Sequence, residues 1–223
     1  MTSRLLRSAA ATVVLLAAGV GSGCAAKGAA SGPEVAAAPS PSPTGAVPTS
    51  AAELEALLVE QVPSGLPPVP DDELDPPAGE KTVDDVAGYG DDAAEQRAVL
   101  TDYGYLRGWE RFWRADGGQT SVFLDQFERP EGAGTYAHDL ARNDAEYYGG
   151  MLDSAPGDLP AGCVTMARDD PATAHGLAGP AAFAWCSSGV FTVAVAAVAR
   201  TPDAARAELT AVTVEQLDRL PPD

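Results

Sequence analysis

The segment Gly104–Tyr148 limits most strongly how this chain can fold, because it predicts strand, tight turn, strand and helix in direct succession. Aromatic and β-branched residues indicate strands at about Tyr105–Arg114 and Thr120–Arg129. Asp116-Gly117-Gly118 between them is typical of a hairpin turn. Glu131–Tyr148 has apolar residues at helical spacing and is followed by two glycines. Such a helix buries its apolar stripe on one face of the hairpin sheet.

The other elements are predicted from apolar spacing and from start and stop residues. They are a short helix at 50–62 behind the capping box Ser50-Ala-Ala-Glu53, a helix at 91–103 capped by Asp92, a strand at Val164–Ala167, a hairpin of Phe183–Ser187 and Val190–Ala199, and a last helix capped by Thr201. The expected fold is therefore α+β. Residues 91–221 form the globular domain, an antiparallel sheet of about four or five strands packed with helices in the order helix, hairpin, helix, hairpin, helix.

The N-terminus has the features of a secretory signal peptide over residues 1–23. Arg4 and Arg7 precede the apolar run Ala9–Val20, and small residues follow up to Cys24. A membrane anchor that stays in place is the alternative interpretation. The apolar run is too short for one, because a spanning helix needs about 20 apolar residues.

The four residues Gly21-Ser22-Gly23-Cys24 resemble a bacterial lipobox. The resemblance implies that the mature chain starts at Cys24 and carries a diacylglyceryl thioether, with acyl chains such as palmitate, on its sulfur. Gly21 departs from the pattern, which usually has an aliphatic residue there. Cleavage nearby, for example after Ala26, is the alternative and would give a freely secreted protein.

The cysteine count also fits export. Without Cys24, the chain keeps Cys163 and Cys186, an even pair that would form a disulfide in an oxidising compartment. Two buried free thiols are the alternative. The chain has no CxxC pair, and His138 and His175 stand alone, so the spacing of a zinc site is missing.

Composition describes what surrounds the domain. The chain has 32 acidic and 14 basic residues, which argues against nucleic acid and anionic lipid surfaces as partners. Residues 24–49 are rich in Ala, Pro and Ser and predict a lipidated, disordered tether. Residues 63–90 predict an acidic, Pro-rich loop. Several carboxylates there suit calcium, but no EF-hand spacing is present, and a solvated loop is the alternative.

The first strand of the hairpin is the candidate binding face. Strand alternation puts five aromatic and basic side chains on one side: Tyr105, Arg107, Trp109, Arg111 and Trp113. Such a face can be a platform for a sugar or a peptide. Alternatively, some of the rings are core and the arginine stems lie over them. We expect the 50–62 helix to dock on the domain and cover part of this face, although it could instead hold a partner.

The sequence contains none of the common catalytic motifs GxSxG, HExxH, Walker A, GxGxxG and CxxC. His138 and Asp139 are adjacent, but neighbours on a helix do not face each other, so they form no dyad by themselves. We therefore assign no catalytic residue, no metal ligand and no cofactor from the sequence.

The order of elements, with the segment Gly104–Arg114, Phe127, Ala133 and Tyr136, resembles actinobacterial cell-envelope lipoproteins of the PsbP-like, LpqN-type α+β class. The resemblance covers about residues 91–220 and implies a non-enzymatic envelope domain that binds proteins or small ligands. No functional residue transfers through it.

Together these features predict a lipid-anchored domain on the extracytoplasmic face of the cell membrane, or a secreted one if the lipobox is not used. Its expected partners are the membrane, through the lipid, and an envelope protein, a small ligand or a glycan. The rival is a secreted or lipid-anchored hydrolase whose carboxylates are dispersed in sequence. A deep pocket with two close carboxylates would favour the hydrolase, and a shallow aromatic groove would favour binding.

Overall fold

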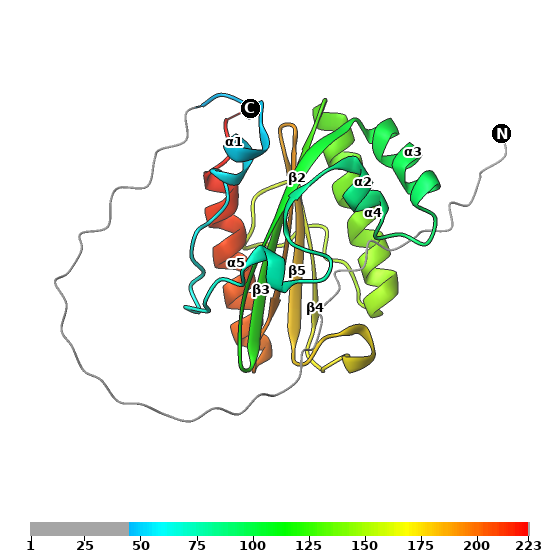
Figure 1. Ribbon diagram of the computed structural model, residues 1–223. Coiled ribbons are helices and arrows are strands. Elements are labelled where there is room, and N and C mark those ends of the chain that lie inside the picture. Colours follow the sequence, from blue (N-terminus) through cyan, green and yellow to red (C-terminus); the bar gives the residue numbers. More distant parts are fainter. Residues whose placement is uncertain (1–44, 223) are drawn as a thin grey trace.

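The computed structural model describes residues 45–222, and within them one antiparallel sheet has helices on both faces (Figure 1). The sheet has six strands in the order β1-β2-β3-β6-β5-β4. The strands are β1 Gly79–Lys81, β2 Tyr105–Ala115, β3 Gly118–Phe127, β4 Cys163–Arg168, β5 Ala181–Ser188 and β6 Phe191–Val198. The expected α+β fold is confirmed. The strand beyond the expected number is β1, which comes from the segment predicted to be a loop.

Most helices begin at the caps that the sequence predicts. Asp92, for example, accepts hydrogen bonds from the backbone N–H groups of Ala94 and Glu95, and Thr201 accepts one from Ala204. The α-helices are α1 Ala51–Glu55, α2 Val83–Ala87, α3 Ala93–Tyr103, α4 Pro130–Tyr148 and α5 Pro202–Asp218, with short 3₁₀ turns η1 Asp71–Glu73 and η2 Thr173–His175.

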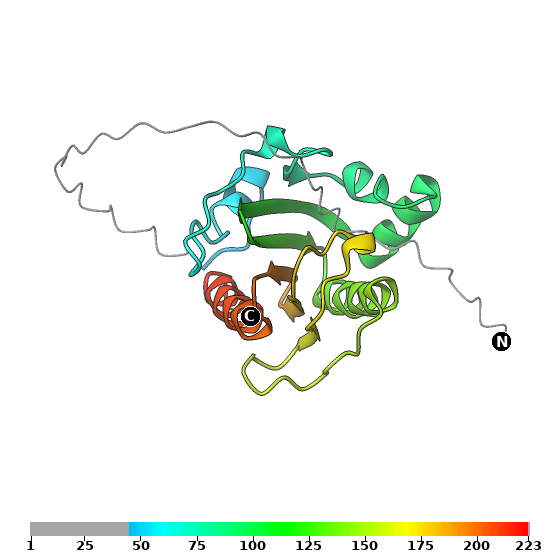
Figure 2. The same cartoon turned by 90° about the horizontal axis from the view of Figure 1, so that it is seen from below.

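Different segments cover the two faces of the sheet, as Figures 1 and 2 show together. On one face, α5 packs on the central strands, and the segment from Leu54 to Leu66 packs beside it over β2. On the other face, α4 packs on β5 and β6, with α2 and α3 beside it. The central strands β5 and β6 are therefore buried on both sides, which explains why β6 is almost continuously apolar.

Two predicted segments differ in the structure. The helix expected over 50–62 is helical only at Ala51–Glu55. Leu54 within this helix and Leu58 and Val59 after it are nevertheless fully buried. The apolar spacing predicted burial correctly, but the helix ends at Glu55, where turn hydrogen bonds from Leu57 to Leu54 and from Leu58 to Glu55 replace the helical pattern. The loop expected over 63–90 contains β1 and α2. Its capping box, in which Thr82 and Asp85 exchange hydrogen bonds, starts a helix of only five residues.

Candidate functional site

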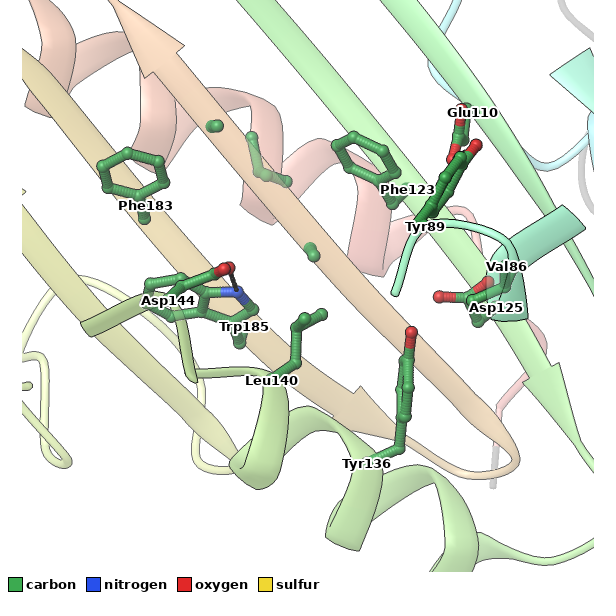
Figure 3. Close-up of a pocket in the computed structure, with 13 residues that line it drawn as sticks. Val86, Tyr89, Glu110, Phe123, Asp125, Tyr136, Leu140, Asp144, Phe183 and Trp185 are labelled. Carbon is green, nitrogen blue, oxygen red and sulfur yellow. Dashed lines mark hydrogen bonds between the residues drawn. The ribbon is translucent and has the colours of Figure 1, made fainter. Parts of the chain in front are cut away.

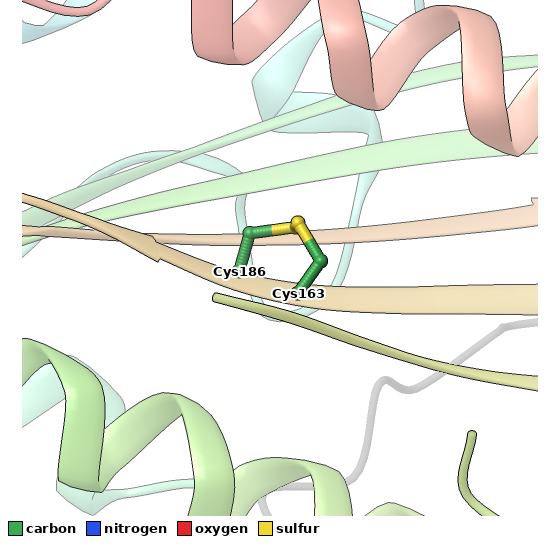
Figure 4. The surroundings of a disulfide bond; sticks show 2 residues. All are labelled: Cys163 and Cys186. Atoms are coloured by element: carbon green, nitrogen blue, oxygen red, sulfur yellow. A yellow bond between two sulfur atoms is a disulfide. The ribbon is translucent and has the colours of Figure 1, made fainter. Parts of the chain in front are cut away.

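The cysteines lie in two different settings. Cys24, the predicted lipidation site, lies outside the described residues, as do the signal peptide and nearly all of the tether. Cys163 and Cys186 form a disulfide between directly paired residues of β4 and β5 (Figure 4). The bond lies on the face that α5 covers, in the larger core cluster. Among the described residues, no helix is both long and apolar enough to cross a bilayer.

The predicted aromatic face is divided by a β-bulge. The pairing of β2 with β3 shifts between Tyr105 and Arg107, so Tyr105 turns to the α4 side and packs with Phe127. The prediction that all five residues share one face of the sheet is therefore wrong. Trp109, Arg111 and Trp113 stay on the α5 side, and Arg107 follows them by strand alternation.

The remainder of that face is covered and is mainly core. Trp113 is fully buried, and its indole N–H donates to the carbonyl of Glu60 at 3.4 Å. Arg111 donates to the carbonyl of Val59 at 3.2 Å and pairs with Glu55 at 3.0 Å. Trp109 is partly buried against the same cluster. The segment after α1 thus docks here, as expected, and the rings do not form an open platform.

A pocket on the opposite face has the chemistry of a binding site. It lies between the sheet and α4, with Tyr89 from the end of the α2 segment at one side (Figure 3). Its walls are largely aromatic or aliphatic, as is usual for ligand sites. The polar groups that converge on it include three carboxyls, one each from β2, β3 and α4: Glu110, Asp125 and Asp144.

Asp144 is the carboxyl with an unused acceptor. Its side chain is only 2% exposed, and its Oδ2 accepts the indole N–H of Trp185 at 3.1 Å (Figure 3). Among the described residues, its Oδ1 is buried and has no hydrogen-bond partner. Burial raises the pKa of Asp144 to about 7, although the Trp185 hydrogen bond opposes this. A buried acceptor without a hydrogen-bond partner lowers the stability of the fold, so a ligand that donates a hydrogen bond to this oxygen would be favoured.

Asp125 and Glu110 form a second, better satisfied group. Burial raises the pKa of Asp125 to about 7, while the hydroxyl of Tyr105, which donates to it at 3.1 Å, opposes the shift. Burial also raises the pKa of Glu110, and the ammonium of Lys81, 3.4 Å away, opposes it. Tyr89 donates its hydroxyl to Glu110 at 2.8 Å. Lys81 is itself buried, so this pair is shielded from solvent.

The free volume of the pocket limits what can enter. It is about 50 Å³, whereas one water needs roughly 10–15 Å³ on the same scale. A group of a few heavy atoms fits, and a complete drug-sized molecule does not. Within residues 45–222, no cluster of three His, Cys, Asp or Glu side chains could hold a metal ion.

The sequence interpretation missed all three carboxyls of the pocket. A signal for two of them was present, because each is a polar residue at a position that its element buries. Asp144 continues the helical stripe of Tyr136, Leu140 and Tyr148 at intervals of four residues. Asp125 directly follows the apolar run Val122-Phe123-Leu124 in the buried half of its strand. No local signal shows that these two positions face one pocket.

The adjacent pair considered for catalysis lies elsewhere. His138 is exposed on α4. Asp139 accepts a hydrogen bond from the hydroxyl of Tyr103 at 2.6 Å and pairs with Arg142 at 2.8 Å. The Tyr103 hydrogen bond thus joins α3 to α4, and the Arg142 pair lies within α4.

Comparison with known proteins finds a partial likeness to one solved structure. No family model matches the sequence, and no curated protein matches it. Among solved structures, the chain is similar to the extracellular domain of PknH from Mycobacterium tuberculosis, with 13% identity and a TM-score of 0.45. The match covers 78% of this chain and 98% of that domain. At this identity and score, no functional residue passes from one protein to the other.

Proposed function

We propose that this chain is an extracytoplasmic binding domain whose pocket receives the hydrogen-bond-donating, cationic end of a small ligand. The unpartnered Oδ1 of the buried Asp144 is the observation that carries the proposal. A ligand ammonium or hydroxyl group supplies the donor that this oxygen lacks, and the gain is greatest for a charged donor.

The surroundings of Asp144 favour a cation over a neutral group. Several aromatic rings line the same pocket, and the face of an aromatic ring attracts a cation. They are Tyr89, Phe123, Tyr136, Phe183 and Trp185. The net charge of −18 also raises the concentration of cations near the surface. The small volume suits the head of a ligand, and its remainder stays outside the pocket.

Three probes with the same carbon chain test the chemistry: butylammonium, 1-butanol and butyrate. The full chain is titrated with each at pH 8, and binding is followed by NMR at the indole N–H of Trp185, which bonds Asp144. We expect butylammonium to bind most tightly and butyrate least. Below a pH of about 7, binding of butylammonium weakens, because a protonated Asp144 no longer balances the cation.

A matched pair of variants locates the effect. Asp144→Asn removes the ionisable oxygen, and we expect about tenfold weaker butylammonium binding, the order of one charge-assisted hydrogen bond. Glu146→Gln changes the net charge by the same amount on the exposed side of α4 and leaves binding unchanged. Equal binding of butyrate and butylammonium, or equal loss in both variants, would contradict the proposal.

The location of the domain is part of the same proposal. The signal peptide pattern, the lipobox-like segment ending at Cys24 and the Cys163–Cys186 disulfide all support an exported protein held to the membrane by lipid. An envelope protein or a glycan as a further partner remains a proposal of the same kind.

A hydrolase is the second candidate, and one observation favours it. Asp125 and Asp144 line one pocket, and each has a pKa of about 7, so either could exchange a proton near neutral pH. Nitrophenyl esters and glycosides test this candidate. Turnover that Asp125→Asn and Asp144→Asn both abolish would support it, and absence of turnover by the wild-type chain would exclude these two substrate classes.

A further inference from the structure

A second cavity lies at the end of the sheet where the β2–β3 hairpin turns. We call it the hairpin cavity. Its volume is about 410 Å³, which is in the range of roughly 300–1,000 Å³ typical of small-molecule sites. It is bounded by the hairpin turn, the end of β6 and the loop 171–180. It shares no lining residue with the pocket at Asp144.

Small residues keep the hairpin cavity open. Most of its lining is glycine, alanine or proline, whose side chains leave space beside the backbone: Ala115, Gly117, Gly118, Pro171, Gly176, Ala178, Gly179, Pro180 and Ala199. The backbone holds this shape, because the N–H of Ala199 donates to the carbonyl of Pro180 at 3.0 Å.

The charge of the hairpin cavity is opposite to that of the chain. Arg114 and Arg200 line it, and none of its described lining residues is acidic. In a chain with 32 acidic and 14 basic residues, this local excess of positive charge is unusual. Arg200, like Arg107, Arg129 and Arg168, forms no ion pair among the described residues. The arginines that pair with carboxylates there are Arg97, Arg111, Arg142, Arg206 and Arg219.

The guanidinium of Arg200 is positioned by the hairpin turn. It donates to the carbonyl of Asp116 at 3.3 Å, which uses one of its five N–H donors. It also lies directly over Gly117, where a Cβ would come within 2.5 Å of its Nε. Gly117 has a φ of +84°, a backbone conformation that side chains rarely adopt, so the turn favours glycine at this place. The exposed guanidinium of Arg200 is thus held to the turn by one hydrogen bond, and most of its donors are left for another acceptor.

We propose that the hairpin cavity binds the carboxylate or phosphate group of a small molecule. A guanidinium matches the two oxygens of such a group with parallel N–H donors, which gives both strength and orientation. The rest of this chain repels anions at long range. Binding therefore depends on direct contact with the two arginines and not on general attraction to the surface.

Inorganic phosphate and succinate are the probes. The full chain is titrated with each, and NMR follows the backbone N–H groups of Gly117, Gly118, Gly176 and Gly179, which surround the cavity. We expect saturable shifts at these glycines. Tighter binding of phosphate would identify phosphorylated molecules as the ligand class, and tighter binding of succinate would identify carboxylates.

Variants separate the site from general charge. Arg200→Gln is expected to weaken binding about tenfold or more, the order of a charge-assisted hydrogen bond. Arg200→Lys keeps the charge but loses the paired donors, so it weakens binding less. Arg142→Gln removes an exposed arginine on α4 and leaves binding unchanged. Arg114→Gln repeats the test from the β2 side of the cavity.

Two results would overturn the proposal: no saturable shift at the four glycines with either probe, or the same loss in Arg142→Gln as in Arg200→Gln. Thermal unfolding of each variant confirms that it is folded before binding is compared. Because the pocket at Asp144 shares no residue with this cavity, failure here leaves the amine-binding proposal standing.

Discussion

At the scale of single residues, burial of the carboxyls of Asp125 and Asp144 opposes folding when they are ionised. Both carboxyls are buried and each has a pKa of about 7, where 3.8 is usual. In the unfolded chain they would ionise near their usual pKa, so between about pH 4 and 7 the folded state binds more protons. The contribution of these two carboxyls to stability is therefore greatest below this window and is lost as pH rises through about 7.

The variant Asp144→Asn tests this cost. It keeps an oxygen that can accept the Trp185 indole N–H, but it cannot ionise. We expect it to be more stable than the wild type at pH 8, by a few kcal/mol at most, since a shift of this size corresponds to on the order of 4 kcal/mol. At pH 4 the difference should vanish. Urea unfolding at the two pH values measures it, and equal stability differences at both would contradict the assignment.

At the scale of elements, the segment after α1 contributes to the core without being a helix. Leu58→Ala removes a side chain that is 1% exposed in the larger core cluster. We expect it to lower the free energy of unfolding by about 2–5 kcal/mol, as for other buried leucines. Leu106→Ala, on a strand residue that is 41% exposed, is the matched control and should have little effect. Comparable losses would mean that the segment does not dock.

The elements that the sequence predicted best are those with a local physical cause. The caps Asp92 and Thr201 fix where α3 and α5 begin, and the glycines at 104 and 149 end α3 and α4 in left-handed conformations. The β-bulge after Tyr105 has no such local mark. Strand alternation therefore assigned Tyr105 to the wrong face, because one extra residue reverses every side chain beyond it.

The candidate sites were harder to predict than the fold, since both depend on contacts between distant residues. The pocket at Asp144 brings together β2, β3, β5 and α4, and the hairpin cavity joins Arg114 to Arg200. Asp125 and Asp144 are unusual in the sequence because each is a polar residue at a position that its element buries. Nothing in the spacing of Arg114 and Arg200 shows that a folded hairpin brings them to one cavity.

At the scale of the whole molecule, the decisive prediction concerns attachment. Expressed in a native-like bacterial host, the chain should partition into detergent, and Cys24→Ala should release it or leave it unprocessed, because the proposed lipid is carried by this sulfur. Mass spectrometry of the mature N-terminus provides the measurement. A mature chain that begins beyond Cys24 without a lipid would contradict lipid anchoring.

The chain enters the domain at one end of β3, where the side-chain amide of Gln126 donates to the carbonyl of Pro48 at 2.8 Å. Gly118 and Gln119, at the other end of the same strand, line the hairpin cavity. Strand residues advance by about 3.3 Å each, so roughly 25 Å separates the two places. If the chain hangs from a membrane by its N-terminal segment, that strand acts as a spacer. It then places the hairpin cavity at the end of the domain far from the membrane attachment, where molecules that approach from outside the cell would reach it first.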